Sequence, residues 1–132
     1  MVKIQTNKKG FTLVELIVVI AIIGVLSAIL VPTMLGFVRD AKDSRVQESA
    51  NSIFSAANTA VAKSVTLSVE NTLLTSYTIT AGSDVTIATG VKLSDYMDVS
   101  KIKGSGTITV DLTTNSVKQV SYTEFGITKT AS

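Results

Sequence analysis

Hydrophobic residues follow three successive patterns along this chain, and each pattern predicts a different kind of element. From Phe11 to Val31 almost every residue is aliphatic, which is typical of a helix that meets an apolar environment on all sides. From Val38 to about Val65 apolar residues recur every three or four positions, which predicts an amphipathic helix. From Asn71 onward an alternation with a period of two begins, which predicts strands.

The first segment is long enough to cross a membrane. As a helix its roughly 21 residues would extend about 30 Å, the thickness of the hydrocarbon core of a bilayer. It contains one charged residue, Glu15, close to its start. Pro32 has no N–H group, so the hydrogen bond to the Ala28 carbonyl is lost and we expect the helix to kink or loosen there. Gly24 and Gly36 are further weak points.

The amphipathic segment has one apolar and one charged face. Its apolar face consists of Val46, Ala50, Ile53, Ala57, Ala60, Val61 and Ser64. Its charged face carries Arg39, Asp40, Lys42, Asp43, Arg45 and Glu48. We interpret the charged face as solvated surface, with salt bridges between subunits as the alternative. Residues 12 to about 66 are expected to form one helix about 80 Å long.

The alternating pattern in the last part of the chain predicts a small antiparallel sheet. Tyr77–Thr80 and Val85–Ile87 are predicted strands, separated by a turn at Ala81–Asp84. The clearest hairpin joins Thr107–Leu112 to Val117–Tyr122 through a short polar turn. Its inward side chains are expected to be Ile108, Val110 and Leu112. The aromatic residues expected to fill the core of the sheet are Tyr77, Tyr96, Tyr122 and Phe125.

These elements together predict an α+β fold. One long N-terminal helix, hydrophobic in its first half and amphipathic in its second, is expected to pack against the small antiparallel β-sheet, because the sheet buries the apolar face of the amphipathic half. The segment from Leu93 to Ile102 is expected to be irregular or to carry one helical turn.

Composition and charge narrow the class of function. The formal net charge is +2, but Lys3, Lys8 and Lys9 all precede Gly10, and without them nine basic residues face ten acidic ones. A basic start fits retention of the N-terminus in the cytoplasm, and no basic stripe suggests nucleic-acid binding. The chain has no cysteine and no histidine, which excludes disulfides, Cys/His zinc sites, thiol nucleophiles and histidine bases.

Candidate chemistry is accordingly sparse. Asp95 and Asp98 could contribute to a calcium loop, but two carboxylates without the surrounding pattern are weak evidence, and a surface loop is the favoured interpretation. Serine and threonine hydroxyls have no histidine partner, so a hydroxyl nucleophile has no support. We therefore expect a protein that is not an enzyme and that has no metal or cofactor.

The junction before the apolar segment carries a resemblance to a known family. Gly10-Phe11-Thr12-Leu13-Val14-Glu15, preceded by two lysines, resembles the class III signal of type IV pilins and pseudopilins. The resemblance implies that a prepilin peptidase cuts between Gly10 and Phe11 and N-methylates Phe11. Glu15 matches the glutamate of that family near the mature terminus, and Gly24 and Pro32 match its helix-weakening positions.

Glu15 also has a physical reason to seek a partner. A carboxylate in hydrocarbon costs on the order of 2–3 kcal/mol at mid-depth and less near a helix end. Cleavage at Gly10 would create a cationic amine on Phe11 in the same apolar layer. In a stack of parallel helices, Glu15 of one subunit could meet the Phe11 amine of a neighbour and fix the axial register. The alternative is that Glu15 reaches the lipid headgroups.

The resemblance implies a division of the chain and a life cycle. Residues 1–10 would be the leader, 11–37 the hydrophobic transmembrane and assembly helix, 38–66 the amphipathic helix, and 67–132 a small β-rich domain. The expected function is a structural subunit of a type IV pilus, and a major pilin is favoured. The expected partners are other copies of the chain, the prepilin peptidase, the pilus assembly platform, other pilins and, before assembly, the membrane.

The location is expected to change with assembly, and three other functions stay open. The precursor would cross the cytoplasmic membrane once with its N-terminus inside, and the assembled protein would lie in an extracellular pilus. The alternatives are a pseudopilin of a type II secretion or competence system, a membrane-anchored extracytoplasmic binding module, and a secreted protein cut after the apolar run. No small-x-small cleavage site follows that run, which ends Ile29-Leu30-Val31-Pro32.

Overall fold

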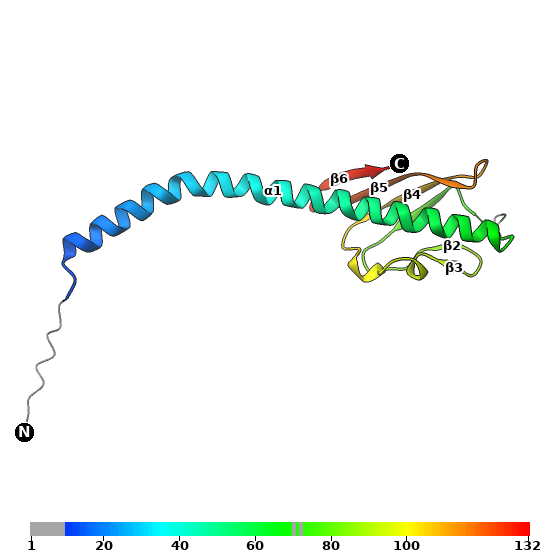
Figure 1. The fold of residues 1–132 in the computed structure, drawn as a ribbon, viewed down its shortest axis with the longest axis horizontal. Helices are drawn as coiled ribbons and strands as arrows, with labels where there is room; N and C mark the ends of the chain where they lie inside the picture. Colours follow the sequence, from blue (N-terminus) through cyan, green and yellow to red (C-terminus); the bar gives the residue numbers. More distant parts are fainter. Residues whose placement is uncertain (1–9, 70, 72) are drawn as a thin grey trace, which may run out of the picture. The chain divides into compact units, whose positions relative to one another are not determined.

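A computed structural model of the chain describes residues 10–69, 71 and 73–132, so residues 1–9 of the predicted leader lie outside the described residues. Within these residues, the elements that carry the fold are helix α1 (Leu13–Thr66) and strands β1 (Ser76–Ile79), β2 (Thr86–Ala88), β3 (Val91–Lys92), β4 (Ser105–Asp111), β5 (Ser116–Glu124) and β6 (Ile127–Ala131) (Figure 1). The predicted α+β class is confirmed.

Helix α1 is a single continuous helix of 54 residues, which confirms the prediction of one long element. Its contour length is about 81 Å at 1.5 Å per residue. Pro32 lies inside α1 and does not end it. The C-terminus closes with a Schellman motif, because the Val69 N–H donates to the Ser64 carbonyl at 2.9 Å and the Ser68 N–H donates to the Val65 carbonyl at 3.0 Å. Ser68 has a φ of 55°, the left-handed conformation that this motif requires.

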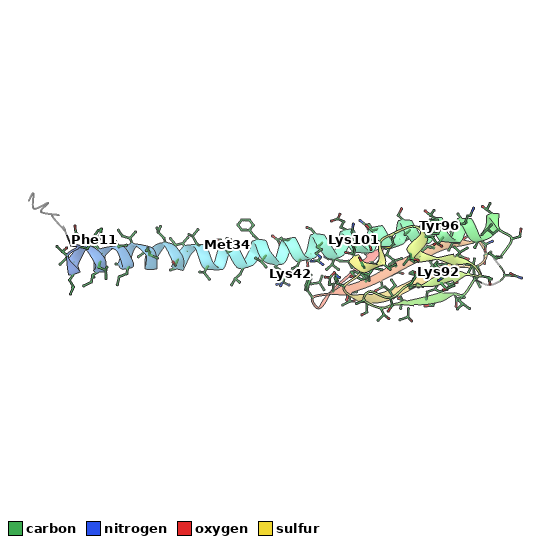
Figure 2. The ribbon with its side chains drawn as sticks, turned by 90° about the horizontal axis from the view of Figure 1, so that it is seen from below. Phe11, Met34, Lys42, Lys92, Tyr96 and Lys101 are labelled. Carbon is green, nitrogen blue, oxygen red and sulfur yellow. The ribbon has the colours of Figure 1, made fainter. Side chains whose placement is uncertain are left out.

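The described chain forms two compact units, with the boundary between Arg39 and Asp40. The first unit contains the apolar half of α1. Its side chains project on all sides of the helix, and none from residue 10 to residue 38 is buried within the chain (Figure 2). The second unit, from Asp40 to Ser132, contains the rest of α1 and the strands.

In the second unit, α1 lies along the strands and buries one face against them (Figure 1). The buried residues of α1 are Val46, Ala50, Ile53, Ala56, Ala57, Ala60, Val61 and Ser64. This set contains every residue of the predicted apolar face, which is thereby confirmed, and adds Ala56. A polar contact also joins the two layers, because the Val117 N–H of β5 donates to Asn58 Oδ1 at 3.0 Å.

The main sheet has four antiparallel strands in the order β1-β4-β5-β6. The predicted hairpin is confirmed as β4 and β5, and Ile108 and Val110 are buried as expected. The inward orientation predicted for Leu112 was wrong, because its side chain is 45% exposed. Strand β4 ends at Asp111, whose carboxylate accepts the Thr113 N–H at 2.8 Å and so turns the chain before Leu112 can continue the alternation.

The two earlier predicted strands exist, but they belong to different sheets. Strand β1 pairs with β4, whereas β2 pairs with β3 in a separate two-stranded sheet. The segment from Leu93 to Ile102 contains the 3-10 turns Leu93–Asp95 and Val99–Lys101, one more turn than expected.

The aromatic residues do not all fill the core. Tyr77 and Tyr122 are buried and Tyr96 is half-buried against the core. The prediction for Phe125 was wrong: its side chain is 52% exposed. Phe125 and Gly126 form the two-residue turn between β5 and β6, where Glu124 pairs with Ile127. A turn position places the Phe125 side chain beyond the end of the sheet rather than on its inner face.

Candidate functional site

The predicted cleavage residues lie directly before the first turn of α1. Gly10 and Phe11 precede the helix, and the Phe11 side chain is 88% exposed. A methyl group added to Gly10 would meet no other atom within 4 Å. Among the described residues, nothing therefore crowds the backbone at Gly10.

Thr12 and Glu15 cap the helix reciprocally. The Glu15 N–H donates to Thr12 Oγ1 at 3.2 Å, and Glu15 Oε2 accepts the Thr12 N–H at 2.8 Å and the Thr12 hydroxyl at 2.7 Å. This arrangement is a capping box, in which two N–H groups that the helix cannot pair internally find side-chain partners. It holds the acid at the positive end of the helix dipole.

The capping box was missed by the sequence analysis, although its local signature is present. A Ser or Thr followed three residues later by Glu, just before an apolar run, marks a helix N-terminus. Thr12-Leu13-Val14-Glu15 has this form. The consequence is that α1 starts at Leu13, which leaves Gly10 and Phe11 outside the helix.

The apolar half of α1 offers a large hydrophobic surface to whatever surrounds it. The helix is long and apolar enough to cross a membrane, and none of its most apolar stretch is buried inside the chain. Exposed apolar surfaces of this extent mark sites of contact with lipid or with other proteins. Figure 2 shows this half beginning near Phe11 and continuing past Met34.

The predicted weak points lie within this exposed half. Gly24 and Gly36 have nothing within 4 Å of an added methyl group, so packing within the chain does not require glycine at either position. Pro32 cannot donate to the Ala28 carbonyl. One residue further on, the Thr33 hydroxyl donates to the Leu30 carbonyl at 2.8 Å, a back-bonding arrangement that tends to bend helices.

Comparisons with known proteins bear directly on this N-terminal arrangement. The family model described as "Prokaryotic N-terminal methylation motif" matches residues 5–31. The "Type IV major alpha-pilin" of Moraxella bovis is 29% identical over 124 residues, which are 88% of this chain and 76% of that protein. The resemblance to type IV pilins noted at Gly10–Glu15 is thereby confirmed, and with it the expected class of a structural subunit rather than an enzyme. In this sense of similarity the chain is called a pilin below.

Two further relatives match the pilin over shorter stretches. The "Type IV wide pilus major component" of Thermus thermophilus is 52% identical over 40 residues, which are 30% of each chain. The "Type IV major pilin protein" of Myxococcus xanthus is 35% identical over 54 residues, 41% of this chain and 24% of that protein. These two alignments therefore cover less than two thirds of the relatives' own lengths. No solved structure was found to match the pilin.

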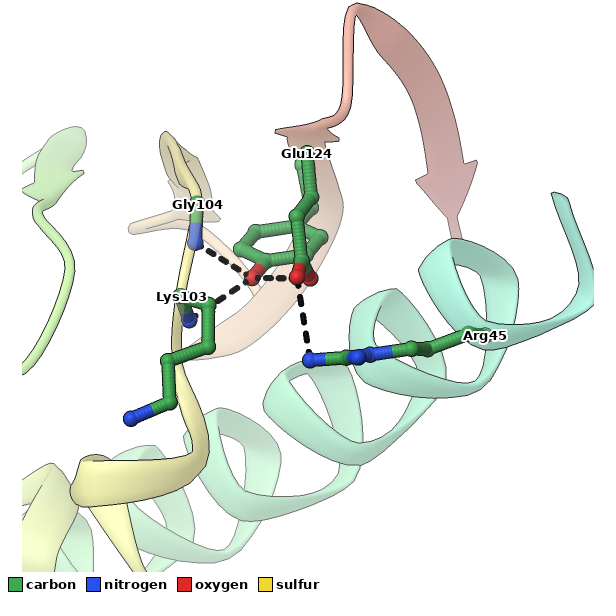
Figure 3. Close-up of polar contacts among 5 residues, drawn as sticks. Arg45, Lys103, Gly104 and Glu124 are labelled. Atoms are coloured by element: carbon green, nitrogen blue, oxygen red, sulfur yellow. Dashed lines mark hydrogen bonds and ion pairs between the residues drawn. The ribbon is translucent and has the colours of Figure 1, made fainter. Parts of the chain in front are cut away.

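In the globular unit of the pilin, a polar network with a buried end joins α1 to the sheet (Figure 3). Glu124 is only 6% exposed, and its Oε1 lies 3.0 Å from Arg45 Nη2 on α1. The Tyr122 hydroxyl donates to Glu124 Oε2 at 3.1 Å and accepts the N–H groups of Gly104 at 2.7 Å and Lys103 at 3.2 Å. One hydroxyl thus joins β5 to the segment that precedes β4.

The environment of Tyr122 keeps its hydroxyl protonated. Burial raises the pKa of the phenol above its ordinary value, and the Glu124 carboxylate raises it further, while the N–H groups of Gly104 and Lys103 act in the opposite direction. No local sequence signal could have revealed this network, because Arg45 and Glu124 come from distant parts of the chain.

The two carboxylates considered for calcium serve as partners of local turns. Asp95 Oδ2 accepts the Lys92 N–H at 3.1 Å. Asp98 Oδ1 accepts the Ser100 hydroxyl at 2.6 Å and the Ser100 N–H at 3.1 Å, and these hydrogen bonds lower the pKa of Asp98. Among the described residues, no three His, Asp or Glu side chains gather in a group that could hold a metal ion.

Proposed function

We propose that this pilin is the major subunit of a type IV pilus, made as a membrane-anchored precursor and polymerised through its apolar helix after processing. The observation that carries the proposal is the fully exposed apolar half of α1, which begins directly behind a peptidase signal. The relatives support a major rather than a minor subunit, because each of the three described above is named as a major pilin or major pilus component.

The processing step uses the chain ahead of the helix. A prepilin peptidase cuts between Gly10 and Phe11 and methylates the new amine of Phe11. The capping box supports this step, because it starts α1 at Leu13 and leaves the scissile bond outside the helix, where a protease can bind it in extended form. Gly10 has no side chain to obstruct a narrow active site.

The apolar half of α1 then serves in two environments. In the precursor it crosses the cytoplasmic membrane, with residues 1–10 inside and the globular unit outside. In the filament the same surface packs against the apolar helices of other pilins. Because lipid contacts are exchanged for helix contacts, the apolar surface stays away from water throughout, and an assembly platform can extract subunits without exposing it.

Glu15 sets the axial register of the filament. Both capping hydrogen bonds of its carboxylate use Oε2, and Oε1 accepts no hydrogen bond from any described residue. Cleavage creates a cationic amine on Phe11, and Oε1 of a neighbouring subunit can receive it without breaking the cap. A misplaced subunit would leave two unpaired charges in an apolar core, which is strongly unfavourable.

Substitutions at the helix start separate the charge of Glu15 from its capping role. Glu15→Gln keeps an oxygen that can accept the Thr12 N–H but removes the charge, whereas Thr12→Val keeps the charge and removes the hydroxyl, at a cost of about 1 kcal/mol in capping. We expect Glu15→Gln and Glu15→Ala to be processed but to form few filaments, and Thr12→Val to assemble. Glu48→Ala, which removes an exposed acid further along α1, is the matched control.

Two measurements check these expectations in the native host. Mass spectrometry of the mature protein should find methylated Phe11 at the N-terminus in every variant; a retained Met1 would support a membrane-anchored binding module, and a terminus beyond Val31 a secreted protein. Electron microscopy of sheared filaments then compares assembly. Normal filaments from Glu15→Gln would refute the register argument. A host that forms no surface filaments from this subunit would favour a pseudopilin of a secretion or competence system.

A further inference from the structure

We infer that the globular unit binds anionic lipid headgroups while the pilin is still in the membrane. The contact surface, called here the headgroup patch, consists of Phe125 in the β5–β6 turn and of Lys42 and Arg45 on α1. The inference rests on the proposed membrane-anchored precursor and goes beyond it, because it assigns a lipid contact to residues outside the apolar segment.

The three side chains of the headgroup patch are gathered on one surface of the second unit. Lys42 Nζ and Arg45 Cζ each lie 5.3 Å from the centre of the Phe125 ring. Both distances are within the range of a cation–π contact. The ring remains 52% exposed and the Arg45 side chain is also 52% exposed, so the patch faces solvent in the isolated chain.

Phe125 occupies a position that the fold alone does not explain. Its φ is 56° and that of Gly126 is 74°, as in the tight two-residue turns that favour Asn, Asp or Gly. A bulky aromatic residue in the left-handed conformation is a rare outlier. The core does not use the ring either, because half of it is exposed. A role in contact with something outside the chain accounts for an aromatic residue at this position.

Chain connectivity keeps the patch within a few residues of the end of the apolar segment. From Leu13 to Val38 the helix rises about 39 Å, which exceeds the hydrocarbon core of about 30 Å and approaches the 40–45 Å that includes the headgroups. Lys42 follows four residues later, about 6 Å further along the helix, and Figure 2 labels it where the strands begin to accompany α1. Aromatic rings and basic side chains are the groups that membrane proteins place at this depth.

The charges around the patch leave a positive surplus. Asp43 is neutralised by Lys129 at 3.2 Å, and Glu124 is buried against Arg45. Three further cations near the patch, Arg39, Lys42 and Lys103, make no ion pair with any residue in the described ranges. The remaining acids nearby, Asp40 and Glu48, offset two of them. A surplus of one charge beside an aromatic ring fits an anionic lipid surface rather than an acidic protein partner of high charge.

Single tryptophans can test the contact, because the natural chain has none. Full-length Phe125→Trp pilin is reconstituted in vesicles of phosphatidylcholine with or without phosphatidylglycerol, containing lipids brominated near the headgroup. Leu112→Trp is the matched control, because its turn lies at the other end of β5, roughly 25 Å away at about 3.3 Å per residue. Leu26→Trp, in vesicles whose lipids are brominated near the ends of the acyl chains, reports insertion of the apolar segment itself, because Leu26 lies about 20 Å from Leu13 along the helix.

In the anionic vesicles we expect bromine to quench F125W fluorescence about twice as strongly as L112W fluorescence. Without phosphatidylglycerol the quenching of F125W should be weaker. Adding Lys42→Gln to F125W should lower the equilibrium constant of the contact about fivefold, the effect of one basic residue near an anionic surface, whereas Lys63→Gln should not. As a check without a tryptophan, amide exchange of residues 124–127 in the unaltered pilin should slow in anionic nanodiscs.

The outcomes separate this inference from the proposed function. If L26W is not quenched, membrane anchoring itself fails. If L26W is quenched but F125W behaves like L112W and the amides of residues 124–127 exchange equally in both lipids, only the headgroup contact is refuted. Shielding of F125W that occurs solely in assembled filaments would make the patch a subunit interface and would likewise overturn the inference.

Discussion

Tyr122 is the residue on which the junction between the sheet and the segment before β4 depends most directly. Replacing it with Phe removes the acceptor for the N–H groups of Lys103 and Gly104 and the donor to Glu124. Buried polar groups left without partners cost about 1–3 kcal/mol. We therefore expect Tyr122→Phe to lower the thermal midpoint of the detergent-solubilised pilin in near-UV circular dichroism, with Tyr96→Phe, at a half-buried ring, as the control.

The folding stability of Tyr122→Phe should also depend on pH differently from that of the unaltered pilin. Burial raises the pKa of Tyr122 in the folded state above its ordinary value of 10.0, so the unfolded chain releases this proton first as the pH rises. The stabilisation is complete below about pH 10 and is lost as the pH rises through the folded-state pKa. Stability of the unaltered pilin should fall above about pH 10, and the fall should be shallower in Tyr122→Phe. Parallel pH profiles would contradict the role assigned to this phenol.

Residue-scale features were predictable only where the partners are close in sequence. Thr12 and Glu15 are three positions apart, and their pattern is sufficient to predict a helix start. Phe125 is different. Its hydrophobic character favoured a place in the core, but its position in a two-residue turn was decided by the pairing of Glu124 with Ile127, which the pattern of apolar residues did not reveal.

At the scale of elements, α1 continues through Pro32, and the stability of its backbone hydrogen bonds around this residue can be measured. Pro32→Ala restores a donor to the Ala28 carbonyl and removes a steric clash, together worth about 3 kcal/mol in a helix interior. We expect amide hydrogen exchange of residues 28–36 to slow markedly in lipid nanodiscs. Gly24→Ala is the control, because its smaller gain of about 1 kcal/mol should be confined to its own turn. Unchanged exchange around Pro32 would mean that the proline does not loosen the helix.

Elements built from neighbouring residues were easier to predict than the pairing between distant ones. The β4–β5 hairpin follows from alternating residues on both sides of a short polar turn. The partner of β1 does not, since β1 pairs with β4 across a segment that forms a second sheet of its own. Strand β6 was not predicted, because its five residues alternate only weakly between buried and exposed positions and depend on the edge of β5 for their hydrogen bonds.

At the scale of the whole molecule, the core of the pilin belongs to one unit. Every residue of the described hydrophobic core lies at Val46 or later. A fragment of residues 40–132 should therefore fold cooperatively in water without the apolar half of α1. Sharp near-UV circular dichroism and a single thermal transition would verify this expectation. A fragment that begins at Ser55 lacks Val46, Ala50 and Ile53 and should not fold; equal behaviour of the two fragments would show that the helix face does not hold the sheet.

The sequence by itself determined the long helix, the change from an apolar to an amphipathic half, the buried face of the second half and the match to the N-terminal methylation motif. Each of these depends on residues that lie within a few turns or strand positions of one another. Tertiary structure alone decided the partner of β1, the polar network of Arg45, Tyr122 and Glu124, and the contact of Phe125 with Lys42. The physical reason is that these contacts join segments far apart in the chain, and their geometry exists only after the sheet has packed on the helix.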